Sequence, residues 1–224
     1  MNKLTFSDGF STSFRLAMNQ FWSVLGACLL WLITVWIPYI NVGTTIGLIR
    51  LQIKLGRGEQ IDAGEIFDAE NRAAMGKIFL LWSFMTTGII IGLIFFIIPG
   101  IVLWSAWFFS SMLILDRKLD PIQAMSKSYD LTYGYKWVIF FIITLIQIAY
   151  GFAAMLFDPT TSFMLPILLG YEMYYSILYY GDFPGVYLSL TFITIAIYLT
   201  GSVWLMAAYG YMYARLSSNK KSKK

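Results

Sequence analysis

A cluster of acidic residues is the first feature of this sequence that could do chemistry, because carboxylates can bind metal ions. Five acidic residues fall close together in one polar segment: Glu59, Asp62, Glu65, Asp68 and Glu70. Such a group could hold a divalent cation, but its spacing matches no calcium-binding loop, and the central glycine turn of such a loop is missing. We therefore expect a solvated loop or surface helix here, and no metal site.

Few other residues in the sequence are candidates for catalysis. The chain contains no histidine, which excludes every mechanism that needs an imidazole, and its one cysteine, Cys28, lies in an apolar run where a structural thiol is expected. No phosphate-binding glycine loop or Gly-x-Ser-x-Gly motif is present. Asp116, Asp120 and Asp130 could reach lipid headgroups, so a membrane enzyme is an alternative. The sequence favours a protein that is not an enzyme and needs no cofactor.

The composition is that of a membrane protein. Of the 224 residues, 58% are hydrophobic and 12% are charged, whereas soluble domains carry about 25% charged residues. The mean hydropathy is +0.68. These values exclude a water-soluble globular domain, a disordered chain and a disulfide-stapled secreted module. At about 20 residues for each crossing, the length allows roughly six spans with short loops.

Six apolar runs are candidates for membrane-spanning helices. They show no period-two alternation, which argues against a β-barrel, and all six prolines fall at their ends or in connections. The runs cover residues 21–37, 42–55, 78–98, 101–115, 137–157 and 186–215. We therefore expect an all-α, polytopic helical bundle of about six spans over residues 21–215, with short interfacial helices. An amphipathic cytoplasmic lead-in (1–20) precedes it and a basic cytoplasmic tail (216–224) follows.

Basic residues sort to one side of this arrangement. With six crossings, all 16 lysines and arginines lie on the side of the two termini, whereas the other side holds Asp158, Glu172 and Asp182. The positive-inside rule then places both termini in the cytoplasm. Segment 163–180 could be a seventh span, but its tyrosines at helical spacing favour an interfacial or re-entrant helix on the outer face, within 158–185.

A short amphipathic helix is predicted between the fourth and fifth runs. Asp120 suits the N-cap, Pro121 suits the first helical position and Gly134 suits the stop. One apolar stripe of this helix comprises Ile122, Met125 and Tyr129. We expect the helix to lie on the inner leaflet.

This segment also resembles a family pattern. The string Pro99-Gly100-Ile101, followed by Asp120-Pro121-Ile122-x-Ala124-x-x-x-Ser128-Tyr129-x-Leu131-Thr132-x-Gly134, is similar to one in a superfamily of bacterial membrane proteins. That superfamily comprises the glycerophosphodiester phosphodiesterase membrane-domain family and the related YciC-like proteins. The resemblance covers about 40 of the 224 residues. It implies about six helices in a bacterial cytoplasmic membrane and a structural rather than catalytic motif.

Two departures from the family pattern stand out. Tyr129 occupies a position where tryptophan is common. No phosphodiesterase domain is attached, since that domain needs histidines, and this implies a stand-alone membrane module.

Small and polar residues within the runs suggest packing and transport sites. Pairs of small residues four apart let helices approach closely, within one chain or between two copies: Gly43 and Gly47, Gly88 and Gly92, Gly210 and Ala214. The spans lack ionisable groups between their interfacial turns, so the best polar positions are Thr86, Thr87 and Gln147. These three either hydrogen-bond between helices or line a path for a neutral solute.

Two functions from different classes are compatible with these features. The favoured one is a non-catalytic integral protein of the cytoplasmic membrane that acts through contacts with lipids or a partner protein. The alternative is a small transporter, channel or export and self-immunity component that moves a neutral or amphipathic solute. The expected partners are membrane lipids and either another membrane protein or a second copy. The basic tail fits an orientation signal and an anionic-lipid contact better than a nucleic-acid site.

Overall fold

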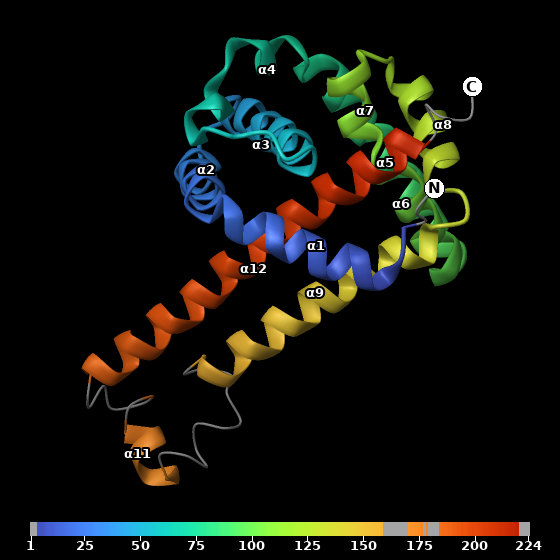
Figure 1. Ribbon diagram of the computed structural model, residues 1–224. Helices are drawn as coiled ribbons and strands as arrows, with labels where there is room; N and C mark the ends of the chain where they lie inside the picture. Colours follow the sequence, from blue (N-terminus) through green and yellow to red (C-terminus); the bar gives the residue numbers. More distant parts are fainter. Residues whose placement is uncertain (1–3, 159–169, 177, 179–183, 220–224) are drawn as a thin grey trace.

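The computed structural model describes residues 4–158, 170–176, 178 and 184–219, and these residues form an all-α fold (Figure 1). The predicted fold class is therefore confirmed. In chain order the helices are α1 (Phe6–Asn19), α2 (Phe21–Thr34), α3 (Ile40–Gly56), the 3-10 helix η1 (Ala63–Phe67), α4 (Ala69–Ala73), α5 (Met75–Phe95), α6 (Ile97–Trp107), α7 (Ser110–Arg117), α8 (Pro121–Thr132), α9 (Lys136–Phe157), α11 (Tyr171–Tyr175) and α12 (Pro184–Asn219).

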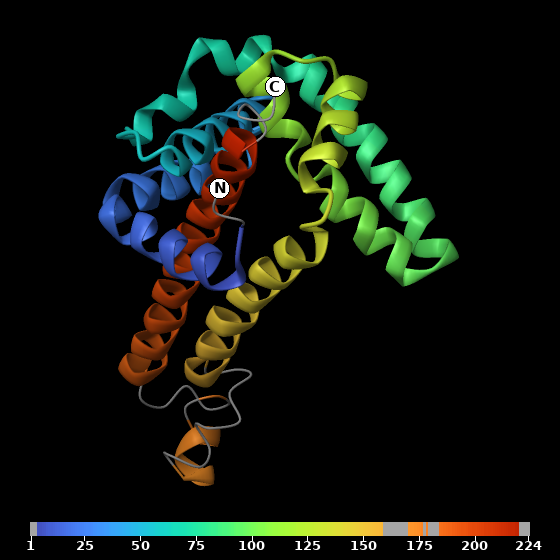
Figure 2. The same cartoon turned by 45° about the vertical axis from the view of Figure 1, so that its right-hand side comes forward.

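Four stretches of the described chain are long and apolar enough to cross a membrane: α5, α6 with α7 (Ile97–Arg117), α9 and α12. They form two hairpins, in which α5 packs against α6 and α9 packs against α12. Figure 2 shows the hairpins diverging downward, while both termini lie in the upper half of the view. At the tip of the α5–α6 hairpin, residues 94–98 are large, apolar and each at least 63% exposed. Such a surface is stable in lipid and unfavourable in water.

The first two predicted spans fold as helices too short for a full crossing. Helix α2 has 14 residues and α3 has 17, which gives lengths of about 21 and 26 Å against a hydrocarbon core of about 30 Å. Helices α1 and α2 qualify as one span only as a pair bent by 83°. In Figure 1, α2 and α3 are seen nearly end-on, whereas α9 and α12 are seen lengthwise. The count of six spans is therefore not confirmed.

A close crossing of α3 and α12 lies at the centre of the core. A Cβ atom on Gly56 would overlap the backbone of Gly210, and one on Gly210 would overlap the carbonyl group of Gln52. Beside the crossing, the Asp116 carboxylate accepts hydrogen bonds from the Arg57 guanidinium at 2.5 Å and the Tyr213 hydroxyl at 2.7 Å. These two bonds join α7 to both crossing helices.

Candidate functional site

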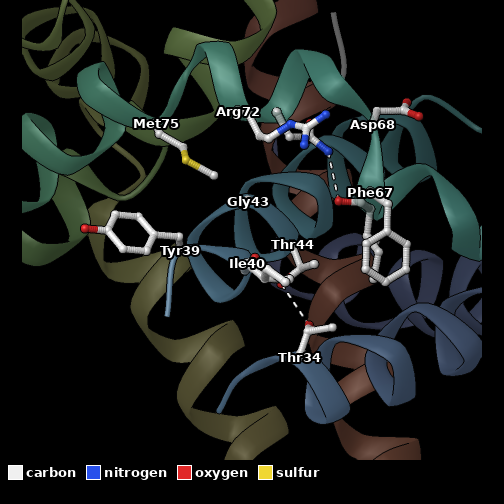
Figure 3. Close-up of a pocket in the computed structure, with 11 residues that line it drawn as sticks. Thr34, Tyr39, Ile40, Gly43, Thr44, Phe67, Asp68, Arg72 and Met75 are labelled. Atoms are coloured by element: carbon white, nitrogen blue, oxygen red, sulfur yellow. Dashed lines mark hydrogen bonds between the residues drawn. The ribbon is translucent and has the colours of Figure 1, made fainter. Parts of the chain in front are cut away.

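A cleft of about 520 Å³ lies between the α2–α3 turn and the segment that runs from η1 to the start of α5 (Figure 3). We call it the α3–α4 cleft. It is lined by Thr34, Tyr39, Ile40, Gly43, Thr44, Ile66, Phe67, Asp68, Asn71, Arg72 and Met75. Its volume is in the range typical of small-molecule sites.

The α2–α3 turn forms one edge of the cleft and is strained. Pro38 stops α2, and its carbonyl oxygen accepts a hydrogen bond from the Ile40 amide at 2.9 Å. This bond closes a γ-turn of the rare form, with Tyr39 at φ 66° and ψ −44°. A conformation of this kind persists only where its surroundings hold it.

Side-chain hydrogen bonds hold the turn in place. The Thr34 hydroxyl donates to the Thr44 hydroxyl at 3.0 Å, and both residues are buried in the lining of the cleft. The Trp31 indole donates to the Thr45 hydroxyl at 2.9 Å, and the Asn41 amide donates to the Val35 carbonyl at 3.2 Å. These bonds anchor the turn, and with it this edge of the cleft, to both α2 and α3.

The opposite wall consists of η1 and α4, which fold back along α3. Gly47 permits this approach, because a Cβ atom there would lie 2.5 Å from Ile66 Cα. The Asn71 side chain is 1% exposed and donates to the carbonyls of Glu65 and Ile66 at 3.2 and 3.0 Å. The Glu65 carboxylate accepts from the Lys54 ammonium at 2.7 Å, which raises the pKa of Lys54. The wall is therefore attached to α3 by both packing and charge.

Asp68 and Arg72 are the charged members of the lining, and both are exposed. Figure 3 shows them together at one edge of the cleft, with Thr34 at the opposite edge. Within the part of the chain that the structure describes, neither forms an ion pair, although Arg50 pairs with Glu70 at 3.0 Å nearby. The cleft therefore joins a largely apolar interior to a rim with one free anion and one free cation. This arrangement suits the binding of an amphipathic molecule.

The predicted small-residue pairs lie at three different contacts. Gly47 faces Ile66 of η1, whereas Gly43 faces the side chains of Arg72 on α4 and of Met75 at the start of α5. On α5, a Cβ atom on Gly88 would lie 2.7 Å from the Trp107 ring, and one on Gly92 would lie 3.0 Å from the Leu103 side chain. The remaining pair is on α12, where Gly210 meets α3 and Ala214 lines a separate cavity beside Arg57.

The structure does not bring together the three residues of the predicted polar path. Thr86 and Thr87 are exposed on α5, and Gln147 is exposed on α9. Helices α5 and α9 belong to different hairpins and are not among the helix pairs in substantial contact. These residues face outward instead of toward a common interior.

The predicted interfacial helix corresponds to α8, which has Pro121 at its first turn and is followed by Gly134 at φ 82°. Asp120 precedes it in an extended conformation, but its carboxylate makes no capping bond and instead accepts from the Lys77 ammonium at 2.7 Å. The predicted apolar stripe lies outward: Ile122 and Tyr129 are exposed and Met125 is half-buried.

The inward face of α8 carries smaller residues, and Ser128 is the most informative of them. Its buried hydroxyl accepts from the Phe109 amide at 3.2 Å and donates to the Ala106 carbonyl at 2.7 Å. Those two backbone groups flank the break between α6 and α7. Ser128 therefore has a structural role that its place in the sequence motif did not reveal.

Two other predictions fall partly outside the described residues. Of the outer-face segment 163–180, only residues 170–176 and 178 are described, and they include the short helix α11. Of the basic tail, residues 220–224 lie outside.

In the acidic segment, the described residues contain no cluster of three potential metal ligands.

The cleft could not be found from motifs, since its lining comes from five helices and the α2–α3 turn and contains no recognisable signature. What the cleft can bind must therefore be argued from its lining residues. In comparisons with known protein families, with curated proteins and with solved structures, nothing matches this chain.

Proposed function

We propose that this protein is a non-catalytic integral membrane protein that binds a membrane lipid in the α3–α4 cleft. The observation that carries the proposal is the junction of an apolar cavity with two unpaired charges at its rim. A phospholipid has the same division, with acyl chains attached to a charged headgroup. Binding sites of this type are mostly apolar, with a few polar groups that orient the ligand.

Exposed aromatic residues around the cleft support a position at the membrane surface. Trp36 and Tyr39 in the α2–α3 turn are 84% and 83% exposed, and Phe67 on the other wall is 49% exposed. Tryptophan and tyrosine favour the headgroup boundary, where the ring contacts apolar groups and its polar atom contacts water. A lipid could therefore enter the cleft from the leaflet without leaving the membrane.

The charges of the η1–α4 wall favour a four-span topology in which α1, α2 and α3 lie along one membrane surface. This wall packs along α3 and reaches the α2–α3 turn. If α3 crossed the bilayer, Asp68 and Arg72 would be carried toward the hydrocarbon, at a cost of about 2.5–3.5 kcal/mol for each charge at the centre. An interfacial α3 avoids this cost.

A topology with four crossings, like one with six, places all the basic residues on one side of the membrane. The side of the two termini then holds all 16 basic residues, so the positive-inside rule makes that side cytoplasmic. We propose the bacterial cytoplasmic membrane as the location. The resemblance to the glycerophosphodiester phosphodiesterase membrane-domain and YciC-like superfamily supports this assignment through the Pro-Gly break and the α8 motif alone.

Native mass spectrometry of the protein released from lipid nanodiscs tests lipid binding. Wild-type protein is expected to retain a phospholipid. Ile40→Trp, which places a bulky ring in the cleft, is expected to lose it. Ile37→Trp is the matched control, because Ile37 is equally exposed in the same turn and does not line the cleft. Wild-type protein free of lipid, or equal retention by Ile40→Trp, would contradict the proposal.

A further inference from the structure

We infer that the α3–α4 cleft selects a zwitterionic aminophospholipid, whose phosphate contacts Arg72 and whose ammonium contacts Asp68. The inference rests on the proposed function and adds the class of headgroup. Its basis is that the rim presents one cation and one anion, and that neither forms a salt bridge in the described structure.

Asp68 is unusual in making neither of two interactions open to it. One is an ion pair with Arg72, four residues on, yet no ion pair joins Asp68 to Arg72. Asp68 is also the N-cap of α4, and its side chain makes no capping hydrogen bond. Asp62, the N-cap of η1, does make one, to the Gly64 amide at 2.9 Å. The Asp68 carboxylate is thus available to an external donor.

The aliphatic part of the Arg72 side chain packs against α3, whereas its guanidinium is exposed. The Cγ atom of Arg72 lies 3.9 Å from the position of a Cβ atom on Gly43, so the aliphatic part of the side chain covers α3. The guanidinium remains exposed at the rim (Figure 3). A planar guanidinium can donate two parallel hydrogen bonds to phosphate oxygens, which makes it a better phosphate ligand than a single point charge.

The charges of Asp68 and Arg72 determine which lipid headgroups fit the cleft. A primary ammonium supplies both charge and N–H donors to Asp68, whereas a quaternary ammonium supplies charge alone. An anionic headgroup without an ammonium would leave the Asp68 carboxylate beside a second negative charge. The order of preference is therefore phosphatidylethanolamine, then phosphatidylcholine, then phosphatidylglycerol.

The other cationic cavity near α4 lacks this pattern. It is lined by Arg50, Lys77 and Lys118. Arg50 already pairs with Glu70 there, and Lys77 pairs with Asp120. The α3–α4 cleft is thus the better place to look for headgroup selection.

Nanodiscs with equal amounts of these three lipids test the inference by native mass spectrometry. Wild-type protein is expected to retain phosphatidylethanolamine about tenfold more than phosphatidylglycerol, which corresponds to one charge-assisted interaction. Asp68→Asn is expected to abolish or reverse that preference. Arg72→Gln is expected to reduce retention of all three lipids by about tenfold. Glu59→Gln and Arg15→Gln, which neutralise exposed charges that do not line the cleft, should match wild type.

The outcomes separate this inference from the function on which it rests. Retention of lipid with the same headgroup distribution in wild type and Asp68→Asn would overturn the inference and leave lipid binding intact. Absence of any retained lipid in wild type would overturn both. Glycerophosphoethanolamine, which has the headgroup and no chains, is expected to bind delipidated protein at least tenfold more weakly than the lipid. Equal binding would overturn the assignment to a lipid.

Discussion

Ser128 illustrates how one side chain satisfies the backbone at an irregular point in a helix. The break between α6 and α7 interrupts the regular pattern of helix hydrogen bonds. The Ser128 hydroxyl accepts from one freed amide and donates to a nearby carbonyl, all in a buried site. An unpaired backbone group in such a site is unfavourable, so the hydroxyl stabilises the break.

Replacing Ser128 by alanine is expected to lower the free energy of unfolding by about 1–3 kcal/mol, because the Phe109 amide loses its acceptor in a buried site. Thermal unfolding in detergent would measure the loss. Ser83→Ala is the control, since the Ser83 hydroxyl is exposed and donates only to a carbonyl of its own helix. Equal stability of the two variants would contradict this role for Ser128.

The sequence placed Ser128 in a motif, but it could not reveal the role of the Ser128 hydroxyl. The cap at Asp120, Pro121 and the stripe of Ile122, Met125 and Tyr129 predicted a short amphipathic helix, and α8 is present. The hydroxyl's partners lie 19 and 22 residues earlier in the chain. Local patterns carry no information about such partners, so the role of this residue had to come from the structure.

At the scale of elements, the crossing of α3 and α12 depends on two glycines. Gly56 and Gly210 bring the two backbones into contact, and neither position has room for a Cβ atom. Gly210 was predicted as a packing residue from its spacing to Ala214. Its partner Gly56 was not, because a lone glycine at the end of a helix is more simply explained as a helix stop.

Gly210→Ala is expected to destabilise the protein by about 1–3 kcal/mol or more, since the added methyl group meets backbone atoms that cannot move aside. Gly151→Ala is the matched control, because Gly151 is within α9 and a Cβ atom there meets nothing within 4 Å. The control should be stabilised slightly by the better helix propensity of alanine. Thermal unfolding of both variants in the same detergent gives the comparison, and similar unfolding temperatures would exclude a tight crossing.

Hydropathy predicted spans that coincide with the helices of the two hairpins, whereas the spans predicted at 21–37 and 42–55 are not confirmed. Four of the six apolar runs, 78–98, 101–115, 137–157 and 186–215, correspond to α5, α6–α7, α9 and α12. Runs 21–37 and 42–55 are also apolar, but they fold as the shorter helices α2 and α3, and the polar η1–α4 segment packs along α3. The outward position of Thr86 and Thr87 was equally unpredictable, because a helix that is apolar on all sides does not indicate which face turns inward.

At the scale of the whole molecule, two apolar hairpins diverge from a cap that consists of α1, α2, α3, η1 and α4. Helices α1 and α3 attach this cap to α12, through the Trp204–Ser13 hydrogen bond and the Gly56–Gly210 contact (Figure 2). We infer that the hairpins cross the bilayer while the cap lies on the cytoplasmic surface. This arrangement presents the α3–α4 cleft to the inner leaflet and makes the α2–α3 turn cytoplasmic, whereas six crossings would place that turn outside.

Cysteine labelling at the α2–α3 turn tests this account most directly. In a Cys28→Ala background, Trp36→Cys would report on the turn, Ser218→Cys on the cytoplasmic side and Glu172→Cys on the outer side, since all three positions are exposed. With a membrane-impermeant maleimide on right-side-out membranes, the account predicts labelling of Glu172→Cys alone, and of all three variants after permeabilisation. Labelling of Trp36→Cys before permeabilisation would show that α2 or α3 crosses the membrane, and it would contradict the account.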